Sequence, residues 1–196
     1  MRLKIVNVGE PILREISRTL SREEILSPSV QELIEHMRQT VGDAPGVGLA
    51  APQIGESLRL AVIEDKAEYH KSLSVSELKE RGRVAIPFHV IVNPVLELLS
   101  DPSEIFFEGC LSLPGFTALV PRASEVRVTC LDHQGEPRVI EASGWYARIL
   151  QHEIDHLHGS LYIDRMHSRS FSSLENYTRH WKDLPADAIA TRSWRF

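Results

Sequence analysis

The sequence predicts a globular fold in which antiparallel β-sheet packs around one buried helix. Short strand-like runs, separated by turns rich in Pro and Gly, recur through the middle of the chain: Val90–Val92, Val95–Leu99, Glu104–Phe107, Ala118–Val120, Val126–Leu131 and Arg138–Glu141. This close spacing is typical of antiparallel sheet. Ser143 is then suited to be the N-cap of a helix that ends at Gly159. Apolar residues lie on nearly every side of that helix, which predicts burial.

The N-terminal half adds a helix and a strand. Residues 29–41 carry apolar side chains at helical spacing among polar ones, which indicates an amphipathic helix that ends at Asp43–Gly46. Leu58–Ile63 has the composition of a strand. The charged segment Glu64–Arg83 has helical character, and we expect it to be an excursion from the core. Beyond Asp164 the polar tail has room for one further helix.

Length and charge narrow the classes of protein. A chain of 196 residues predicts one domain, residues 1–196, with no second core. The net charge of −5, with no basic run, argues against direct binding to nucleic acid. No apolar run approaches the roughly 20 residues needed to cross a bilayer, so we expect no membrane association. Without a signal sequence, Cys110 and Cys130 are expected to be free thiols or a metal-bound thiolate.

The strongest local signal is His152-Glu153-Ile154-Asp155-His156. Two histidines at positions i and i+4 lie on one face of a helix and can bind one metal ion, while Glu153 can act on a water held by that ion. The alternative is a helix whose polar residues are simply solvated. Burial of the helix favours the metal site, since buried imidazoles and carboxylates without partners are costly.

A catalytic metal site needs a third protein ligand, and the sequence offers three sources. The extended metalloprotease pattern fails, because Gly159 fits it but Tyr162 stands where a histidine is required. Glu175 could complete a thermolysin-like site. Cys110, in the turn-forming segment Phe107–Gly115, could present a thiolate, although a single cysteine is more often a small core residue. Glu175 and Cys110 both remain open on spacing alone.

A glycine-rich segment, Gly46–Gly55, matches a dinucleotide-binding turn only superficially. Such a turn follows a strand and opens a helix, whereas here a helix precedes it and Pro52 and Gly55 interrupt any helix after it. The glycines instead suit a close approach of backbone to a ligand. Gln53 would then be a neutral donor to a developing oxyanion, the alternative being an ordinary turn glutamine.

Together, Gly46–Gln53, Glu108–Ser112 and Gln151–His156, in this order and at these separations, resemble the three signature motifs of the peptide deformylase family. Ala142–Leu150 looks like the plant and animal organellar branch, which has bacterial relatives. The similarity spans about residues 6–165 and leaves 166–196 as a C-terminal tail. It implies an α+β fold in which antiparallel sheets pack around a central helix that carries the HExxH motif.

The resemblance also implies roles for individual residues. Cys110, His152 and His156 would bind one divalent metal ion, usually iron(II) and replaceable by zinc, nickel or cobalt. Glu153 would handle protons, and Gln53 with the Leu111 backbone N–H would hold the formyl oxygen. Glu108 would pair with Arg122, and Val47, Trp145, Arg148 and Ile149 would form the wall of an apolar methionine pocket. The expected substrate-binding residues are therefore Gly46, Val47, Gly48, Glu108, Gly109, Trp145, Arg148 and Ile149.

The implied activity is removal of the N-formyl group from the N-terminal formylmethionine of nascent polypeptides, with release of formate. Partners would be formyl-Met peptides and nascent chains near the ribosome, and the protein would be a monomer or homodimer. The chain begins close to the family core, which fits a bacterial cytoplasm, or an organelle after loss of a transit peptide. Two other functions compete: an HExxH metallopeptidase with Glu175 as third ligand, and a non-catalytic, metal-stabilised peptide-binding domain.

Overall fold

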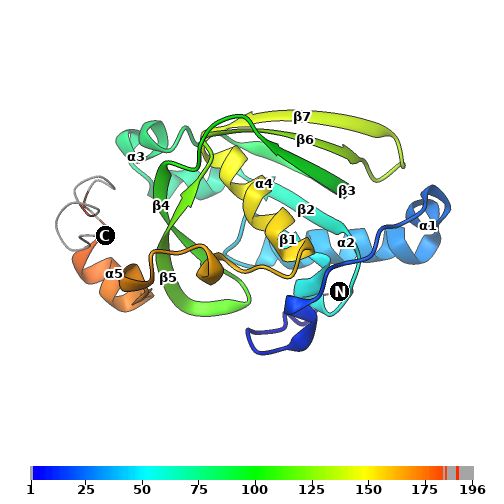
Figure 1. Ribbon diagram of the computed structural model, residues 1–196, viewed down its shortest axis with the longest axis horizontal. Helices are drawn as coiled ribbons and strands as arrows, with labels where there is room; N and C mark the ends of the chain where they lie inside the picture. Colours follow the sequence, from blue (N-terminus) through cyan, green and yellow to red (C-terminus); the bar gives the residue numbers. More distant parts are fainter. Residues whose placement is uncertain (1, 183, 185–188, 190–196) are drawn as a thin grey trace.

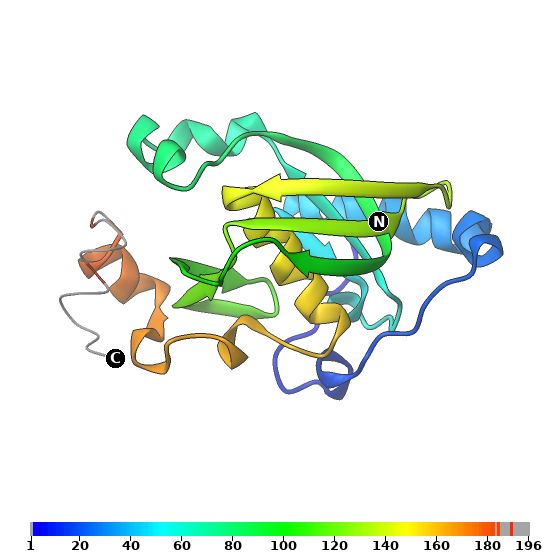
Figure 2. The same ribbon diagram turned by 45° about the horizontal axis from the view of Figure 1, so that its top comes forward.

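The computed structural model describes residues 2–182, 184 and 189, and it is built from two antiparallel sheets and a helix between them. The larger sheet has the strand order β1-β2-β3-β6-β7, and the smaller has the order β4-β5-β8. Helix α4 (Gly144–Leu157) runs between the long strands of the larger sheet and the β4–β5 hairpin (Figures 1 and 2). The predicted combination of antiparallel sheet and helix is confirmed.

The elements follow one another along the chain with short connections. The strands are β1 (Gly48–Ala50), β2 (Leu60–Asp65), β3 (Ile86–Leu98), β4 (Glu104–Cys110), β5 (Leu113–Arg122), β6 (Glu125–Leu131), β7 (Pro137–Ser143) and β8 (Ser172–Ser173). The other α-helices are α1 (Arg22–Leu26), α2 (Pro28–Asp43), α3 (Val75–Glu80) and α5 (Leu174–His180). Short 3₁₀ turns are η1 (Pro11–Arg14), η2 (Ala51–Ile54), η3 (Ala67–Ser72), η4 (Tyr162–Asp164) and η5 (Ser168–Ser170).

Strand β2 lies between two helices, which explains its nearly continuous apolar sequence. Leu60 and Val62 belong to the hydrophobic cluster with α2, whereas Ala61 and Ile63 belong to the cluster with α4. Because successive strand residues point to opposite faces, a strand covered on both sides needs apolar residues at every position. None of these four side chains is exposed to solvent.

The other end of the same sheet is covered on one face only. Val126 and Val128 of β6 and Ile140 of β7 pack toward α4, while Arg127 and Val139 face outward. Such period-2 alternation is what one-sided burial imposes on a strand. Helix α4 therefore packs against the apolar face of the larger sheet and is itself buried along most of its length.

Strand β3 differs from the prediction, since it is a single 13-residue strand and not two runs separated at Pro94. The pairing register of β3 with β6 shifts between Val92 and Val95, and Asn93 has a left-handed backbone with φ of 51°. A bulge of this kind accommodates a proline, which cannot donate a hydrogen bond to the ladder. The sequence signal at Pro94 was real, but it marks a bulge instead of a strand end.

The other predicted helices and strands are observed, with one larger difference: β5 begins at Leu113, so Pro114 and Gly115, expected in a turn, lie inside a strand that was predicted only over Ala118–Val120. The predicted amphipathic helix is α2, and the excursion contains η3 and α3. Arg83 closes the excursion by donating two hydrogen bonds to Asp65, at 2.7 and 2.9 Å. The predicted tail holds β8 and α5, and its residues 183, 185–188 and 190–196 lie outside the described part of the chain. Among the described residues, no helix is both long and apolar enough to cross a bilayer.

Helix α4 ends where the sequence predicts, and Gly159 is required there by contact as well as by backbone angle. Its φ is 72°, and a Cβ added at this position would lie 2.5 Å from the carbonyl oxygen of Arg14. The helix end is thereby packed directly against the N-terminal segment. Gly55 has a similar φ of 87°, but a Cβ there would meet nothing within 4 Å.

These two glycines give a matched test of the helix end. We expect Gly159→Ala to lower the free energy of unfolding by roughly 2–4 kcal/mol, because left-handed strain and a backbone clash act together. Gly55→Ala carries the strain alone and should cost about 1 kcal/mol. Urea unfolding of both variants measures the difference, and equal losses would show that the contact with Arg14 does not hold the helix end.

Candidate metal centre

The two predicted imidazole ligands lie side by side on α4. Their ring centroids are 5.0 Å apart and the ring planes are inclined by 77°. His156 is buried, with 1% of its surface exposed, and His152 is nearly so. Their spacing of four residues places both side chains on the same helix face, which is the face toward the β4–β5 hairpin.

Cys110 reaches the histidines from the opposite side. It is the last residue of β4, where the pairing with β5 shifts register between Glu108 and Cys110 before the chain turns to Leu113. Its Sγ lies 3.4 Å from Nε2 of His156. The three donor atoms of Cys110, His152 and His156 all lie within 4.8 Å of one another. One thiolate and two imidazoles within this span suit a single transition-metal ion with a coordination position left open.

Glu175 lies elsewhere. Its side chain is 76% exposed on α5, where it accepts a hydrogen bond from Arg179. The cluster of possible ligands found among the described residues contains Cys110 and not Glu175. The geometry therefore favours Cys110 over the thermolysin-like alternative.

Glu108 is the carboxylate that orients His152. Its Oε2 lies 3.0 Å from Nδ1 of His152, so this ring nitrogen can donate to it and leave Nε2 to face the other two ligands. Arg122 binds both carboxylate oxygens, at 2.9 and 3.0 Å, as the resemblance implied. Burial alone would raise the pKa of Glu108, but the charge of Arg122 and the hydrogen bond from His152 outweigh it and lower that pKa. Glu108 is therefore ionised.

Arg148 has a larger role in this network than a pocket wall. Its guanidinium donates to Oε1 of Glu108 at 2.7 Å and to the carbonyl oxygens of Val120 and Glu104 at 2.9 and 2.6 Å. One side chain of α4 thus binds both strands of the hairpin. The buried arginine is satisfied by these three acceptors, which is how such a charge can be tolerated in a protein interior.

Asp155, the acidic residue inside the HExxH motif, anchors the other end of the network. It accepts hydrogen bonds from Arg122 at 2.5 Å and from Arg165 at 2.7 Å through each of two nitrogens. Arg122 thereby bridges Glu108 and Asp155. Sequence reasoning did not single out Asp155 or Arg165, although an aspartate in the middle of a buried helix is a signal for an ion pair.

The two histidines differ in their tendency to hold a proton. Burial lowers the pKa of both, but hydrogen bonds to Cys110 and Glu108 raise the pKa of His152 well above its ordinary value. For His156, burial and the charge of His152 lower the pKa well below its ordinary value. His156 is thus a ready neutral ligand, whereas a metal ion must displace a proton from His152.

Glu153 lies on α4 between the histidines and has no partner for one of its oxygens. It is 4% exposed, and its Oε2 makes no hydrogen bond to any described residue. Burial raises its pKa to about 7. Such a group can exchange a proton near neutral pH, as a general base must. His156 Nδ1 is also buried without a partner among the described residues, so unsatisfied polar atoms gather at this centre.

The glycine-rich segment brings backbone close to this carboxylate. A Cβ added at Gly48, in β1, would lie 2.3 Å from Oε1 of Glu153. A Cβ at Gly46 would lie 2.9 Å from Cδ1 of Leu111. The segment was expected to bring backbone close to a ligand, and in the structure its glycines make room for two residues of the site itself.

The amide of Gln53 faces the sulfur of Cys110. Its Oε1 accepts a hydrogen bond from the backbone N–H of Ala50 at 2.9 Å, which fixes the orientation of the group. Its Nε2 then lies 3.5 Å from Sγ of Cys110 and 3.3 Å from Oγ of Ser112. A fixed N–H donor is thus aimed at Cys110, one of the three candidate ligands.

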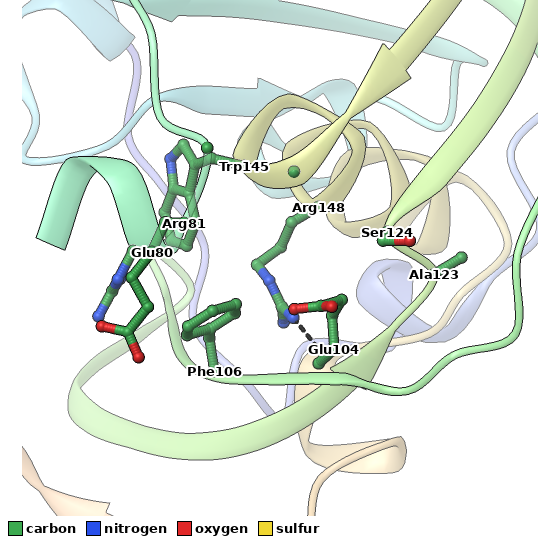
Figure 3. A pocket seen from close by; sticks show the side chains of 10 residues that line it. Glu80, Arg81, Glu104, Phe106, Ala123, Ser124, Trp145 and Arg148 are labelled. Atoms are coloured by element: carbon green, nitrogen blue, oxygen red, sulfur yellow. Dashed lines mark hydrogen bonds between the residues drawn. The ribbon is translucent and has the colours of Figure 1, made fainter. Parts of the chain in front are cut away.

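A cavity of about 160 Å³ opens beside the N-terminal end of α4. Figure 3 shows Trp145 and Arg148 projecting from the helix toward Phe106 of β4, with Arg81 at the end of α3 alongside. The guanidinium of Arg81 lies 5.2 Å from the ring centroid of Trp145 and 5.4 Å from that of Phe106. The excursion predicted from residues 64–83 therefore forms one side of this cavity.

The expected pocket residues divide into two groups. Trp145 and Arg148 line the cavity. Val47 and Ile149 pack instead in the hydrophobic cluster between α4 and the larger sheet. Arg81 was not anticipated, because the charged composition of the excursion gave no indication that it returns to line this cavity.

Comparison with known proteins agrees with this arrangement. The family model for polypeptide deformylase matches residues 2–172. The chain is 47% identical over 184 residues to the chloroplastic peptide deformylase 1A of Solanum lycopersicum, covering 94% of this chain and 65% of that protein. It is 46% identical over 189 residues to peptide deformylase 3 of Streptomyces avermitilis, covering 96% of this chain and 82% of that protein. The chain thus spans about two thirds of the length of the plant relative.

A solved structure shares the fold. A class I type b peptide deformylase from Acinetobacter baumannii, crystallised with Met-Ala-Ser bound, has a TM-score of 0.75 and 33% sequence identity, and the match covers 85% of this chain and 99% of that one. The match to the family model, the relatives and the shared fold lead to one conclusion: this chain belongs to the polypeptide deformylase family.

Proposed function

We propose that this protein is a peptide deformylase, which hydrolyses the N-formyl group of an N-terminal formylmethionine and releases formate. The observation that carries the proposal is the convergence of Cys110, His152 and His156 beside the buried, partly unpaired carboxylate of Glu153. Three ligands and one carboxylate are the components that metal-assisted hydrolysis requires.

The three ligand residues would hold one divalent cation, and we propose iron(II), with zinc, nickel or cobalt able to replace it. When bound, such an ion supplies Lewis acidity, which makes water a better nucleophile and stabilises negative charge on a carbonyl oxygen. Glu153 would accept the proton that the attacking water loses and would pass it to the leaving amine. Its raised pKa suits both steps.

Gln53 and the backbone N–H of Leu111 would stabilise the negative charge that develops on the formyl oxygen. The Gln53 amide is already fixed by Ala50 and directed at Cys110. A fixed donor is not required to reorient when charge develops, and one such donor is typically worth roughly 3–4 kcal/mol of barrier. Fixing it in the unliganded site therefore favours the transition state.

The substrate chain would lie between the glycine-rich segment and the start of the hairpin. Gly46, Val47 and Gly48 would offer backbone groups on one side, and Glu108 and Gly109 would border the other. Trp145, Arg148 and Ile149 would bound the methionine side chain, of which Trp145 and Arg148 line the 160 Å³ cavity. The related Acinetobacter protein, crystallised with Met-Ala-Ser, supports a peptide ligand for this chain.

We infer that nascent chains near the ribosome are the natural substrates and that the protein works as a single domain, monomeric or as a homodimer. Its relatives include bacterial and organellar proteins. We place this chain in a bacterial cytoplasm, with an organelle as the alternative.

Loss of the thiolate tests the ligand set. We expect Cys110→Ala to weaken zinc or cobalt binding by more than the roughly 10- to 100-fold that loss of an outer hydrogen-bond partner costs. Cys130→Ala is the matched cysteine control, because Cys130 is buried in the cluster on the larger sheet. Glu175→Gln controls for the metallopeptidase alternative. Metal content after dialysis is the measurement, and full metal in Cys110→Ala with loss in Glu175→Gln would reverse the assignment.

Replacement of the proton carrier tests catalysis separately from binding. We expect Glu153→Gln to keep its metal and to lower formate release from a formyl-Met peptide by about 10²- to 10⁴-fold, since the isosteric amide cannot accept the proton. If the protein were a peptide-binding domain without activity, the wild-type protein itself would release no formate. That result, obtained with fully metal-loaded protein, would leave binding as the function.

A further inference from the structure

Tyr162 is a buried residue near the metal centre that the mechanism above does not use. It is the first residue of η4, just beyond the end of α4, and only 1% of its surface is exposed. Its ring lies 6.4 Å from that of His152, with the two planes inclined by 18°. It belongs to the hydrophobic cluster against which Cys110 packs. The phenol ring therefore lies beside one predicted ligand, His152, in the cluster that borders another, Cys110.

The hydroxyl of Tyr162 has no hydrogen-bond partner among the described residues. The atom is also closed to solvent, so water cannot satisfy it without a local rearrangement. A buried hydroxyl without a partner destabilises the folded state. A phenylalanine would fill the same space without this cost, so the oxygen needs an explanation.

The neighbouring charges indicate which acceptor the hydroxyl serves. Burial, together with the charges of Cys110 and Glu108, raises the pKa of Tyr162, so the phenol stays protonated and keeps an O–H that can donate to a nearby anion. Glu108 is already occupied, since each of its oxygens accepts two hydrogen bonds from Arg122, Arg148 or His152. The sulfur of Cys110 has contacts from Gln53, His152 and His156 among the described side chains. Both imidazole contacts would be given up when those rings bind the cation.

We propose that Tyr162 is a positioning residue for the metal-binding thiolate: its O–H donates to the sulfur of Cys110 once that sulfur holds the cation. The interaction would draw electron density toward the hydroxyl, so the thiolate would donate less charge to the metal and would resist oxidation better. The inference rests on the proposed role of Cys110 as a ligand. It goes beyond that role by naming the residue that controls how strongly the sulfur donates.

Cobalt-loaded protein gives a direct test, because a thiolate bound to cobalt(II) has a sulfur-to-metal charge-transfer band. We expect this band to move to lower energy in Tyr162→Phe, since a sulfur without the hydrogen bond is easier to oxidise. We also expect cobalt to leave Tyr162→Phe about fivefold faster in the presence of a chelator, which corresponds to one typical hydrogen bond. The matched control is Tyr146→Phe, because the Tyr146 hydroxyl lies 2.9 Å from Nε2 of His89, away from the metal centre. This control should leave the band and the cobalt release rate unchanged.

Thermal unfolding supplies a second measurement that does not depend on the spectrum. Loading with cobalt should raise the melting temperature less in Tyr162→Phe than in the wild type. If the hydroxyl is only an unsatisfied polar group, the variant would melt higher than wild type in both states, with an unchanged band, and the proposal would be overturned. Absence of any sulfur band in wild-type protein would instead refute Cys110 as a ligand, so the two failures are distinguishable.

Discussion

The carboxylate of Glu108 is the constraint on which the site geometry depends. It is 5% exposed and accepts hydrogen bonds from Arg122 of β5 and from Arg148 and His152 of α4. One residue of β4 is therefore tied to both elements that border it. Cys110 follows two residues later on the same strand, so the groups that fix the strand to the helix also set the distance between the thiolate and the imidazoles. Loss of Glu108 would leave two buried guanidinium groups without their main acceptor.

The charges of this network are arranged so that each buried ion meets an opposite one. Arg122 lies between Glu108 and Asp155, and Arg165 adds a second cation to Asp155 from the half-exposed edge. Removing an ion pair from water is expensive, and good geometry with saturated hydrogen bonds is needed to offset the cost. These pairs run across α4, β4 and β5, so they contribute to holding the hairpin over the helix. These ion pairs therefore contribute more to positioning the residues of the site than to the free energy of folding.

Sequence reasoning predicted those parts of the molecule in which local pattern and tertiary environment agree. The alternation in Val126–Leu131 and the all-round apolar helix after Ser143 are direct consequences of one-sided and two-sided burial. The two histidines followed from helix periodicity alone. Cys110 did not, because nothing in the residues before it tells how a turn will approach a helix more than forty positions away. The choice between Cys110 and Glu175 required either the family resemblance or the coordinates.

Other long-range contacts could not be predicted from the sequence either, because local patterns do not reveal which distant segments meet. The pairing of β5 with β8 joins Phe116 to Ser173, and no short-range pattern in a two-residue strand could reveal it. Arg148 was expected in an apolar wall, and besides lining the cavity it donates to three polar acceptors, two on β4 and one on β5. Long-range polar contacts depend on which carbonyl groups the fold leaves unpaired, and that information is absent from periodicity.

Buried polar atoms without hydrogen-bond partners lie next to the candidate metal ligands, where they reduce the stability of the fold. Glu153 Oε2, His156 Nδ1 and Tyr162 Oη are all buried without partners in the described part of the chain, and they lie around the same three ligands. A protein selected for stability alone would replace such groups or pair them. Ser17 and Trp145 carry similar atoms away from the three ligands, but the three atoms beside the ligands destabilise the metal-free fold where the cation would bind. Occupation of the site should therefore stabilise the whole molecule, because the rigid network around Glu108 links the centre to both sheets through α4 and the β4–β5 hairpin.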